Sequence, residues 1–254
     1  MEKILVEAEA LCVWVPGIEG RDELALWTQD KRLIPSDADK ASLPDLSFVP
    51  AMQRRRLTSL SKLAVALAHR LKGFLSPEAK IYFVSLTGES ARQLQVNTMV
   101  LQENEVLPAT FSTSVFNTPP AMVSILLGLK NGYAALYPEV KDFSSAVQTV
   151  LSPLLAGNLS QVLMIYGDVR SPEEYQVLEG ACDTSWGFAV LLSSQGDVAG
   201  FDSCEGYIPY ENEQYPERSA LGVDYCSRDK IKTPQDFLYQ LLQTKAPLLS
   251  LEDE

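Results

Sequence analysis

The sequence predicts an α/β protein in which helices flank a mostly parallel sheet, because strand-like apolar segments alternate with segments of helical period. The clearest helix spans residues 143–156, where apolar side chains recur at i, i+3, i+4, i+7 and i+8. Gly157 follows as a typical helix C-cap. Residues 161–169, QVLMIYGDV, come next and are almost wholly apolar. Such a run is typical of a strand buried on both faces, as the strands of parallel sheets are.

The other elements are predicted from the same patterns along the chain. Further strands are expected in apolar segments bounded by turn residues, at residues 8–16, 80–88, 132–138 and 186–194. Further helices are expected at residues 52–72, 89–102 and 233–245. Residues 107–129 should begin extended and become helical near Pro119 or Pro120. A turn and a short amphipathic piece at 17–27, and surface loops at 34–49 and 205–217, complete the chain, which we interpret as one domain over residues 1–254.

Charge and cysteine content exclude several classes of function. The net charge is −12, from 33 acidic and 21 basic residues, so binding to nucleic acid is not expected. No apolar run is long enough to span a bilayer, and the acidic N-terminus is unlike a signal peptide. We therefore expect a cytoplasmic protein. The four cysteines are scattered without a CxxC pair, which predicts reduced, mostly buried thiols and no metal or cofactor: Cys12, Cys182, Cys204 and Cys226.

Histidine chemistry is restricted because the chain holds a single histidine, His69. It lies off the apolar stripe of the helix predicted at residues 52–72, so a helix-surface position is expected. One histidine cannot form a two-histidine site, and a catalytic triad would have to use this one. Nucleophile-elbow, dinucleotide-binding and phosphate-loop glycine motifs are all lacking from the sequence.

Several segments carry a resemblance to a known family. They are VWVPGIEGRDELALW at 13–27, FVPAMQRRRLTSLSKLAVALA at 48–68, FSTSVFNTPPAMVSILLGLKNG at 111–132 and the strand, helix and strand of 131–169. Together they resemble the N-terminal half of a β-ketoacyl synthase of the thiolase fold, over residues 8–195. The resemblance implies a thiolase-like layered fold of which only this half is present, with residues 196–254 as a loop and a C-terminal helix.

The family's nucleophile position is occupied by Val140 in this chain. Family members read approximately T-A-C-x-[SA]-G-x-x-A-I, with a small residue six positions after the cysteine and a glycine seventeen after it. Counting back from Ala146 and from Gly157 gives position 140 both times. The family's cysteine lies at a helix N-terminus, where the helix dipole lowers the pKa of the thiol. Valine has no lone pair with which to attack, and Ser144 and Ser145 are expected inside the helix.

The resemblance implies a partner that does the chemistry. The second half of a complete ketosynthase supplies two histidines, or a histidine and an asparagine, and no histidine follows His69 here. The pattern is similar to chain-length factors, the inactive subunits of type II polyketide systems, and in particular to those of aryl polyene pathways. Such a subunit pairs with a full-length ketosynthase, as a heterodimer or heterotetramer, and meets the acyl carrier protein through the complex.

Two sets of residues are candidates for these contacts. Partner-interface and tunnel-wall positions implied by the resemblance are Phe111, Phe116, Asn117, Thr118, Met122, Ile125, Leu126 and Leu129. The alternative is that the apolar members pack within this chain's own core. The arginine run Arg54, Arg55 and Arg56 could contact an acidic carrier protein, although such runs also begin helices and pair with local acids.

Two other functions remain open from the sequence. One is a thiolase-fold acyltransferase or decarboxylase that uses a non-standard residue, for which Glu139 and Lys141 would need to be buried and shifted in pKa. The other is a free-standing regulatory or scaffold protein that forms homodimers.

Overall fold

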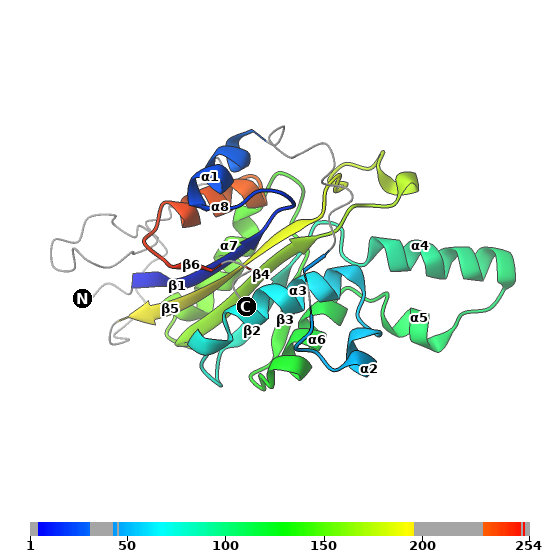
Figure 1. The fold of residues 1–254 in the computed structure, drawn as a ribbon, viewed down its shortest axis with the longest axis horizontal. Coiled ribbons are helices and arrows are strands. Elements are labelled where there is room, and N and C mark those ends of the chain that lie inside the picture. The colour runs from blue at the N-terminus through cyan, green and yellow to red at the C-terminus, as the bar shows by residue number, and fades with distance from the viewer. Residues whose placement is uncertain (1–4, 31–42, 45, 196–230, 250, 252–254) are drawn as a thin grey trace.

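The computed structural model describes residues 5–30, 43–44, 46–195, 231–249 and 251. Its centre is a six-stranded sheet of order β3-β2-β4-β5-β1-β6 (Figure 1). Three of the five strand pairs are parallel, and β5 runs antiparallel to both of its neighbours. The predicted α/β class with a mostly parallel sheet is confirmed. The strands are β1 Leu5–Trp14, β2 Lys80–Val84, β3 Tyr133–Leu136, β4 Gln161–Asp168, β5 Trp186–Gln195 and β6 Leu248–Leu249.

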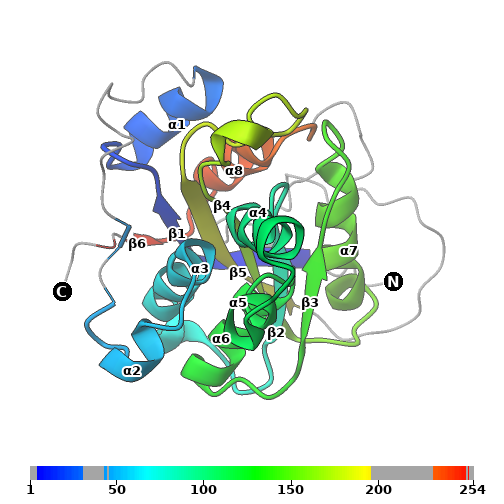
Figure 2. The same ribbon diagram turned by 90° about the vertical axis from the view of Figure 1, so that its right-hand side faces the viewer.

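Helices cover both faces of the sheet (Figure 2). One core packs α7, α8 and α1 on the sheet, and the other packs α3 and α6 on the opposite face. Every residue of β4 is buried between the two cores, as its apolar sequence predicts. The helices are α1 Arg21–Gln29, α2 Ala51–Arg54, α3 Ser59–Arg70, η3 Lys72–Phe74, α4 Ser90–Thr98, η4 Met99–Glu103, α5 Pro108–Ser112, α6 Thr118–Leu127, α7 Ser144–Leu155, η5 Glu173–Tyr175 and α8 Pro234–Leu242.

Three predicted boundaries were wrong, each for a local reason. The helix expected at 52–72 is divided, because the Thr58 side chain accepts a hydrogen bond from the Ser61 N–H and starts α3 as a new helix. The strand expected at 80–88 ends at Val84, because the next residues turn to enclose a buried carboxylate. Residues 108–112 form α5 rather than an extended segment, with Pro108 in its first turn.

The C-terminal segment is tied back to the beginning of the chain. The guanidinium of Arg21 donates to the carbonyl oxygens of Leu242 and Thr244, at 2.7 and 2.9 Å, and also to that of Ala246. Helix α8 starts with a capping box, in which Thr233 and Asp236 each accept from the other's backbone N–H. Its apolar face is buried on the sheet, and β6 then pairs with β1. The sequence patterns predicted the helix but not the elements on which it packs.

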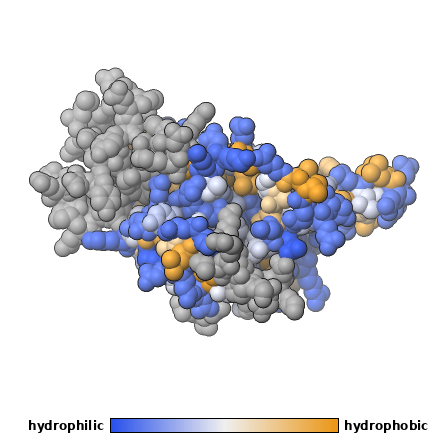
Figure 3. Space-filling view, turned by 90° about the horizontal axis from the view of Figure 1, so that it is seen from above, coloured by the Kyte–Doolittle hydropathy of each residue, from blue (hydrophilic) through white to orange (hydrophobic). Residues whose placement is uncertain are grey.

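An arm made of α4, η4 and α5 projects away from the sheet (Figure 1), and apolar residues lie along it (Figure 3). The helix predicted at 89–102 is present as α4 and the π-helical turn η4, but its apolar side does not enter either core. The large apolar side chains that are exposed here are Val100, Leu101, Leu107, Phe111 and Val115. The arm therefore offers an apolar surface that the described part of this chain does not cover.

The single histidine and the cysteines have structural positions. His69 is half-buried on α3, with its ring stacked on Phe48 at a centroid separation of 3.5 Å. Cys12 and Cys182 are free and buried, as predicted, while Cys204 and Cys226 lie outside the described residues. Burial raises the pKa of the Cys12 thiol to about 12. Across the described segments, every helix is too short or too polar to cross a membrane.

Candidate functional site

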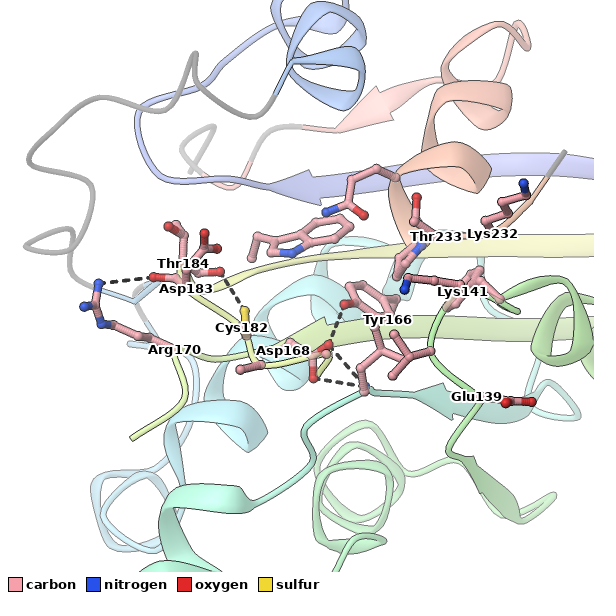
Figure 4. Close-up of a pocket in the computed structure, with 18 of the residues that line it drawn as sticks. Glu139, Lys141, Tyr166, Asp168, Arg170, Cys182, Asp183, Thr184, Lys232 and Thr233 are labelled. Carbon is pink, nitrogen blue, oxygen red and sulfur yellow. Dashed lines mark hydrogen bonds between the residues drawn. The ribbon is translucent and has the colours of Figure 1, made fainter. Parts of the chain in front are cut away.

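A cavity of about 560 Å³ lies where the ends of β4 and β5 meet the start of α7 and the start of α8 (Figure 4). Val140, which the resemblance assigns to the family's nucleophile position, lines it, and that assignment stays a prediction. Aromatic side chains form much of the wall. Trp27 and Trp186 meet edge to face at a centroid separation of 4.9 Å, and Tyr166 lies 4.7 Å from Trp186.

Val140 is held by packing in a turn of unusual backbone conformation. A Cβ on Gly180 would lie 2.8 Å from Cγ2 of Val140, so the valine fits only because residue 180 is glycine. The next residue, Lys141, has a φ of 69° and forms an exposed ion pair with Glu179 at 2.6 Å. That contact raises the pKa of Lys141 and lowers the pKa of Glu179. Glu139 is exposed as well, so neither of the charged residues beside Val140 is buried.

The start of α7 is capped by main-chain groups of the C-terminal segment. A helix leaves its first N–H groups without partners inside the helix, and there they can bind an anion. Here the Phe143 N–H donates to the Lys232 carbonyl at 3.2 Å, and the Ser144 N–H donates to the Ile231 carbonyl at 2.9 Å. Two of the donors that could stabilise negative charge at this site are therefore already used.

The two serines in the first turn of α7 are structural. The hydroxyl of Ser144 is buried and donates to Oδ1 of Asp142 at 2.6 Å. The hydroxyl of Ser145 donates to the Asp142 carbonyl at 2.8 Å. Their expected place inside the helix is confirmed, and neither side chain lines the cavity.

Asp168, at the end of β4, is a fully buried carboxylate on the cavity floor. It accepts hydrogen bonds from three hydroxyls and two backbone N–H groups, which belong to Ser85, Leu86, Thr87 and Tyr166. The Ser85 and Thr87 hydroxyls lie at 2.5 and 2.7 Å. Burial raises the pKa of Asp168, and the hydrogen bonds from Ser85, Tyr166 and Thr87 oppose that rise. All this hydrogen bonding fixes the loop after β2 rather than leaving the carboxylate free to act as a base.

Tyr166 and Cys182 also have defined partners. Burial raises the pKa of Tyr166 well above its ordinary value, and the neighbouring charge of Asp168 adds to the rise. The tyrosine therefore stays protonated, and its hydroxyl donates a hydrogen bond to Oδ2 of Asp168. The thiol of Cys182 lies 2.9 Å from the Thr184 carbonyl, to which it donates. His69 is on the other face of the sheet and does not line this cavity.

The predicted partner-interface residues divide into two groups. Phe111 and Ile125 are 56% and 64% exposed, and Asn117 is exposed at the start of α6. The other predicted positions are buried or partly buried within this chain, namely Phe116, Thr118, Met122, Leu126 and Leu129. Phe116 packs on Phe83 and Tyr137, with ring centroids 6.2 and 5.8 Å away. The interface role stays a prediction, and the exposed group is the part available for direct contact.

The arginine run begins at Arg54, the last residue of the short helix α2. Arg54 donates to the Leu46 carbonyl at 3.2 Å, while Arg55 and Arg56 are exposed. Among the described residues, no carboxylate pairs with Arg55 or Arg56. Contact with an acidic carrier protein stays a prediction for these two side chains.

Asp168, Trp27 and Gln235 are among the cavity residues that the sequence did not reveal, although one of them had a signal. Asp168 is the lone acid within the apolar run of residues 161–169, and a buried acid at a strand end is a marked position. Trp27 and Gln235 had no comparable signal, because they reach the cavity from opposite ends of the chain.

The sheet order, the two helical layers and the cavity at the start of α7 define a thiolase-like α/β fold. The model of the family described as "Beta-ketoacyl synthase, N-terminal domain" matches residues 25–249. The chain therefore belongs to the β-ketoacyl synthase family, as its N-terminal domain. The match continues through α8, beyond the residues 8–195 that carry the resemblance.

Solved structures share the fold at low sequence identity. A ketosynthase in complex with its chain length factor from Xenorhabdus doucetiae matches with a TM-score of 0.63 and 22% identity, covering 76% of this chain and 79% of that chain. The ishigamide ketosynthase/chain length factor matches with a TM-score of 0.56 and 13% identity, covering 85% of this chain and 64% of that chain. A β-ketoacyl synthase from Burkholderia phymatum matches with a TM-score of 0.52 and 12% identity, covering 77% of this chain and 60% of that chain. The last two are thus matched over less than two thirds of their own length. No curated protein matches the sequence.

Proposed function

We propose that the protein is a catalytically inactive chain-length-factor subunit. In this role it pairs with an active β-ketoacyl-acyl-carrier-protein synthase and shapes its acyl tunnel, in type II polyketide or fatty-acid-like aryl polyene biosynthesis. The observation that carries the proposal is the start of α7. Val140 stands at the nucleophile position, and the carbonyls of Ile231 and Lys232 occupy the N–H groups of Phe143 and Ser144.

Acyl transfer needs both a nucleophile and donors for the developing oxyanion. A thiolate at a helix start is stabilised by the helix dipole and by free N–H groups. Removing one oxyanion donor alone costs roughly 100-fold or more in rate in well-studied enzymes. With valine at position 140 the first requirement is unmet, and with the N–H groups of Phe143 and Ser144 engaged the second is met only in part.

The alternative, an acyltransferase or decarboxylase using a non-standard residue, receives less support. Glu139 is exposed and Lys141 forms an exposed ion pair, so the burial that would tune either group is lacking. Cys182 is buried and donates its thiol proton to a backbone carbonyl. Each of these groups is better explained by local structure than by chemistry.

The proposed contact surface combines α5, α6 and the edge strand β3. Within the described sheet, β3 pairs only with β2, so its outer edge can accept a partner strand. Exposed apolar side chains lie on the elements beside that edge: Phe111, Val115, Ile125, Tyr133 and Tyr137. Exposed apolar side chains next to an open strand edge are typical of a protein–protein interface. The partner we propose is a full-length ketosynthase, which brings the acyl carrier protein into a cytoplasmic complex.

Charge placed on this surface is expected to weaken the complex. Phe111→Glu and Ile125→Glu should each reduce affinity for the co-expressed ketosynthase about 10-fold or more, because each buries an unpaired carboxylate in the interface. Isothermal titration calorimetry of the purified complex partners, or the yield of co-purified ketosynthase, measures this. Leu26→Glu is the matched control, because Leu26 is 59% exposed on α1, which packs on the opposite face of the sheet from α6. A wild-type chain that remains a stable monomer in the presence of the ketosynthase would contradict the proposal.

Acyl transfer is expected to label the ketosynthase and not this chain. With radiolabelled acyl carrier protein, the complex should carry label on the partner's cysteine only. Val140→Cys should introduce a thiol that iodoacetamide alkylates with an ordinary pKa of about 8.5, because two of the N–H groups at the helix start are engaged. This thiol should accept no acyl group. Acyl label on the wild-type chain would favour the enzyme alternative instead.

A further inference from the structure

Two of the three most exposed large apolar side chains in the described part of the chain lie at one end of the molecule. They are Leu101, at 84%, in the arm, and Met52, at 74%, in α2 (Figure 1). Neither is isolated, because Val100 and Leu107 are exposed beside Leu101, and Phe48 is exposed just before α2. Apolar side chains gathered in this way are typical of a surface that a partner covers.

The end of the arm carries negative charge next to its apolar side chains. Glu103 and Glu105 are both exposed, and Asn104 turns the chain between them with a φ of 51°. Among the residues that the structure describes, no basic side chain pairs with either glutamate. Leu101, Glu103 and Glu105 are called the arm tip below. The arm tip is thus an apolar surface with an acidic rim.

The short helix α2 carries the opposite charge. Arg55 and Arg56 stand three and four residues after Met52, which is the spacing of neighbours on one side of a helix, and Arg55 keeps the helical conformation. Both arginines are exposed and lack a described carboxylate partner. Met52, Arg55 and Arg56 are called the α2 patch. The α2 patch is thus an apolar surface with a basic rim.

The arm tip and the α2 patch are complementary, and their positions suit a second copy of the chain. With a net charge of −12, two copies repel one another unless local charges of opposite sign meet. The arm projects from the body, at the same end as α2 (Figure 1). A copy related by a two-fold axis can therefore place its arm tip on α2 and receive the other arm tip in return, so that one contact forms twice.

We propose that two copies of this chain associate through a two-fold contact, in which the arm tip of each docks on the α2 patch of the other. The inference goes beyond the proposed function, because the contact uses none of the residues assigned to the ketosynthase surface. Combined with that surface, the contact gives an assembly of two of these chains and two ketosynthases.

Sedimentation equilibrium of the full chain alone, in about 0.15 M salt, tests the contact, because distant charges are then screened. The wild type should be dimeric. Reversing the arm tip with Glu103→Arg and Glu105→Arg should weaken the dimer at least about tenfold, because like charges then meet at both copies of the contact. Reversing the α2 patch with Arg55→Glu and Arg56→Glu should have an effect of the same size.

Mixing the two reversed variants is the decisive measurement. In a mixed pair a basic arm tip meets an acidic α2 patch, and the unchanged acidic arm tip meets the unchanged basic α2 patch. Mixed dimers should therefore form with a dissociation constant within about threefold of the wild-type value. Recovered association also shows that both variants are folded.

The control reverses another pair of exposed acids beside an exposed apolar side chain. Glu173→Arg with Glu174→Arg makes the same change in net charge as the arm-tip reversal, close to Val177, which is 87% exposed. This variant should dimerise within about twofold of the wild type, since its charges lie outside the contact.

Several results would overturn the proposal. A wild-type chain that is monomeric up to its solubility limit does so, as does a dimer that either reversal leaves intact, or a pair of folded reversed variants that do not associate when mixed. Should a reversed variant lose the wild-type thermal melt, glutamine at the same four positions decides, and each neutral pair should weaken the dimer about threefold. Each of these results leaves ketosynthase binding, which is tested separately through Phe111 and Ile125, unaffected.

Discussion

Replacing Asp168 with alanine is expected to lower the free energy of unfolding by about 3–5 kcal/mol, the largest loss we predict for a single side chain. The change removes one acceptor and leaves buried donors from Ser85, Thr87 and Tyr166, together with the Leu86 N–H, without partners. It also frees the loop after β2, which these bonds hold against the end of β4. Urea denaturation followed by circular dichroism measures the loss.

Two further variants distinguish the stability lost with the Asp168 carboxylate from the stability lost by any mutation near the cavity. Asp168→Asn keeps one carbonyl acceptor, and the hydroxyl partners can rotate to accept from its NH₂, so a smaller loss of about 1–3 kcal/mol is expected. Asp183→Ala removes an exposed acid from the same cavity rim and should cost less than about 1 kcal/mol. An Asp168→Ala protein as stable as the Asp183→Ala protein would show that the network is not important for stability.

The second large effect is expected from pH, through Glu89. This carboxyl group is 6% exposed and accepts from the Thr58 hydroxyl at 2.5 Å. Burial raises the pKa of Glu89 to about 7, against the opposing effects of Thr58, Arg92 and Ser61. The folded state therefore holds a proton on Glu89 at pH values where the unfolded chain, with a pKa of 4.5, has released it.

The direction in which stability changes with pH follows from proton binding. Between about pH 4.5 and 7 the folded state binds more protons, so the free energy of unfolding falls as pH rises. The extra stability is fully present below about pH 4.5 and is lost as pH rises through about 7. A rise from 4.5 to about 7 corresponds to about 3 kcal/mol, at about 1.4 kcal/mol per pKa unit.

Glu89→Gln isolates this contribution, because the amide oxygen can still accept from Thr58 but does not titrate. The difference in unfolding free energy between the wild type and Glu89→Gln should shift by about 3 kcal/mol in favour of the variant from pH 4.5 to pH 8. Glu78→Gln changes an exposed carboxyl and should keep the wild-type pH dependence. Parallel pH profiles for the wild type and Glu89→Gln would contradict a raised pKa at this position.

Elements with a strong local pattern were predictable from the sequence. The period of α7 and the unbroken apolar run of β4 each satisfy one simple rule, and both were found within one or two residues. The division between α2 and α3 was missed because a single Thr58 cap interrupted an otherwise continuous apolar pattern. Local capping competes with periodicity, and the pattern over residues 52–72 does not show which prevails.

The site was predictable only in part, because it is assembled over long distances. Val140 was assigned by counting from Ala146 and Gly157, a local relation in one segment, and it lines the cavity. Arg21 reaches carbonyls more than 200 residues away, with a separation of 221 to Leu242. The closing of the cavity by α1 and α8, and with it the position of Trp27 and Gln235 on the cavity wall, depends on that long-range packing. No periodicity or motif within a short window records it.

The main-chain cap on α7 has a consequence for how this lineage can change. Side chains are exchanged by single codon changes, whereas the carbonyls of Ile231 and Lys232 remain whatever residues occupy those positions. A cysteine introduced at position 140 would still meet a helix start at which two backbone donors are engaged. Under the proposed inactive role, a point mutation at position 140 would therefore change the side chain and leave both main-chain contacts in place.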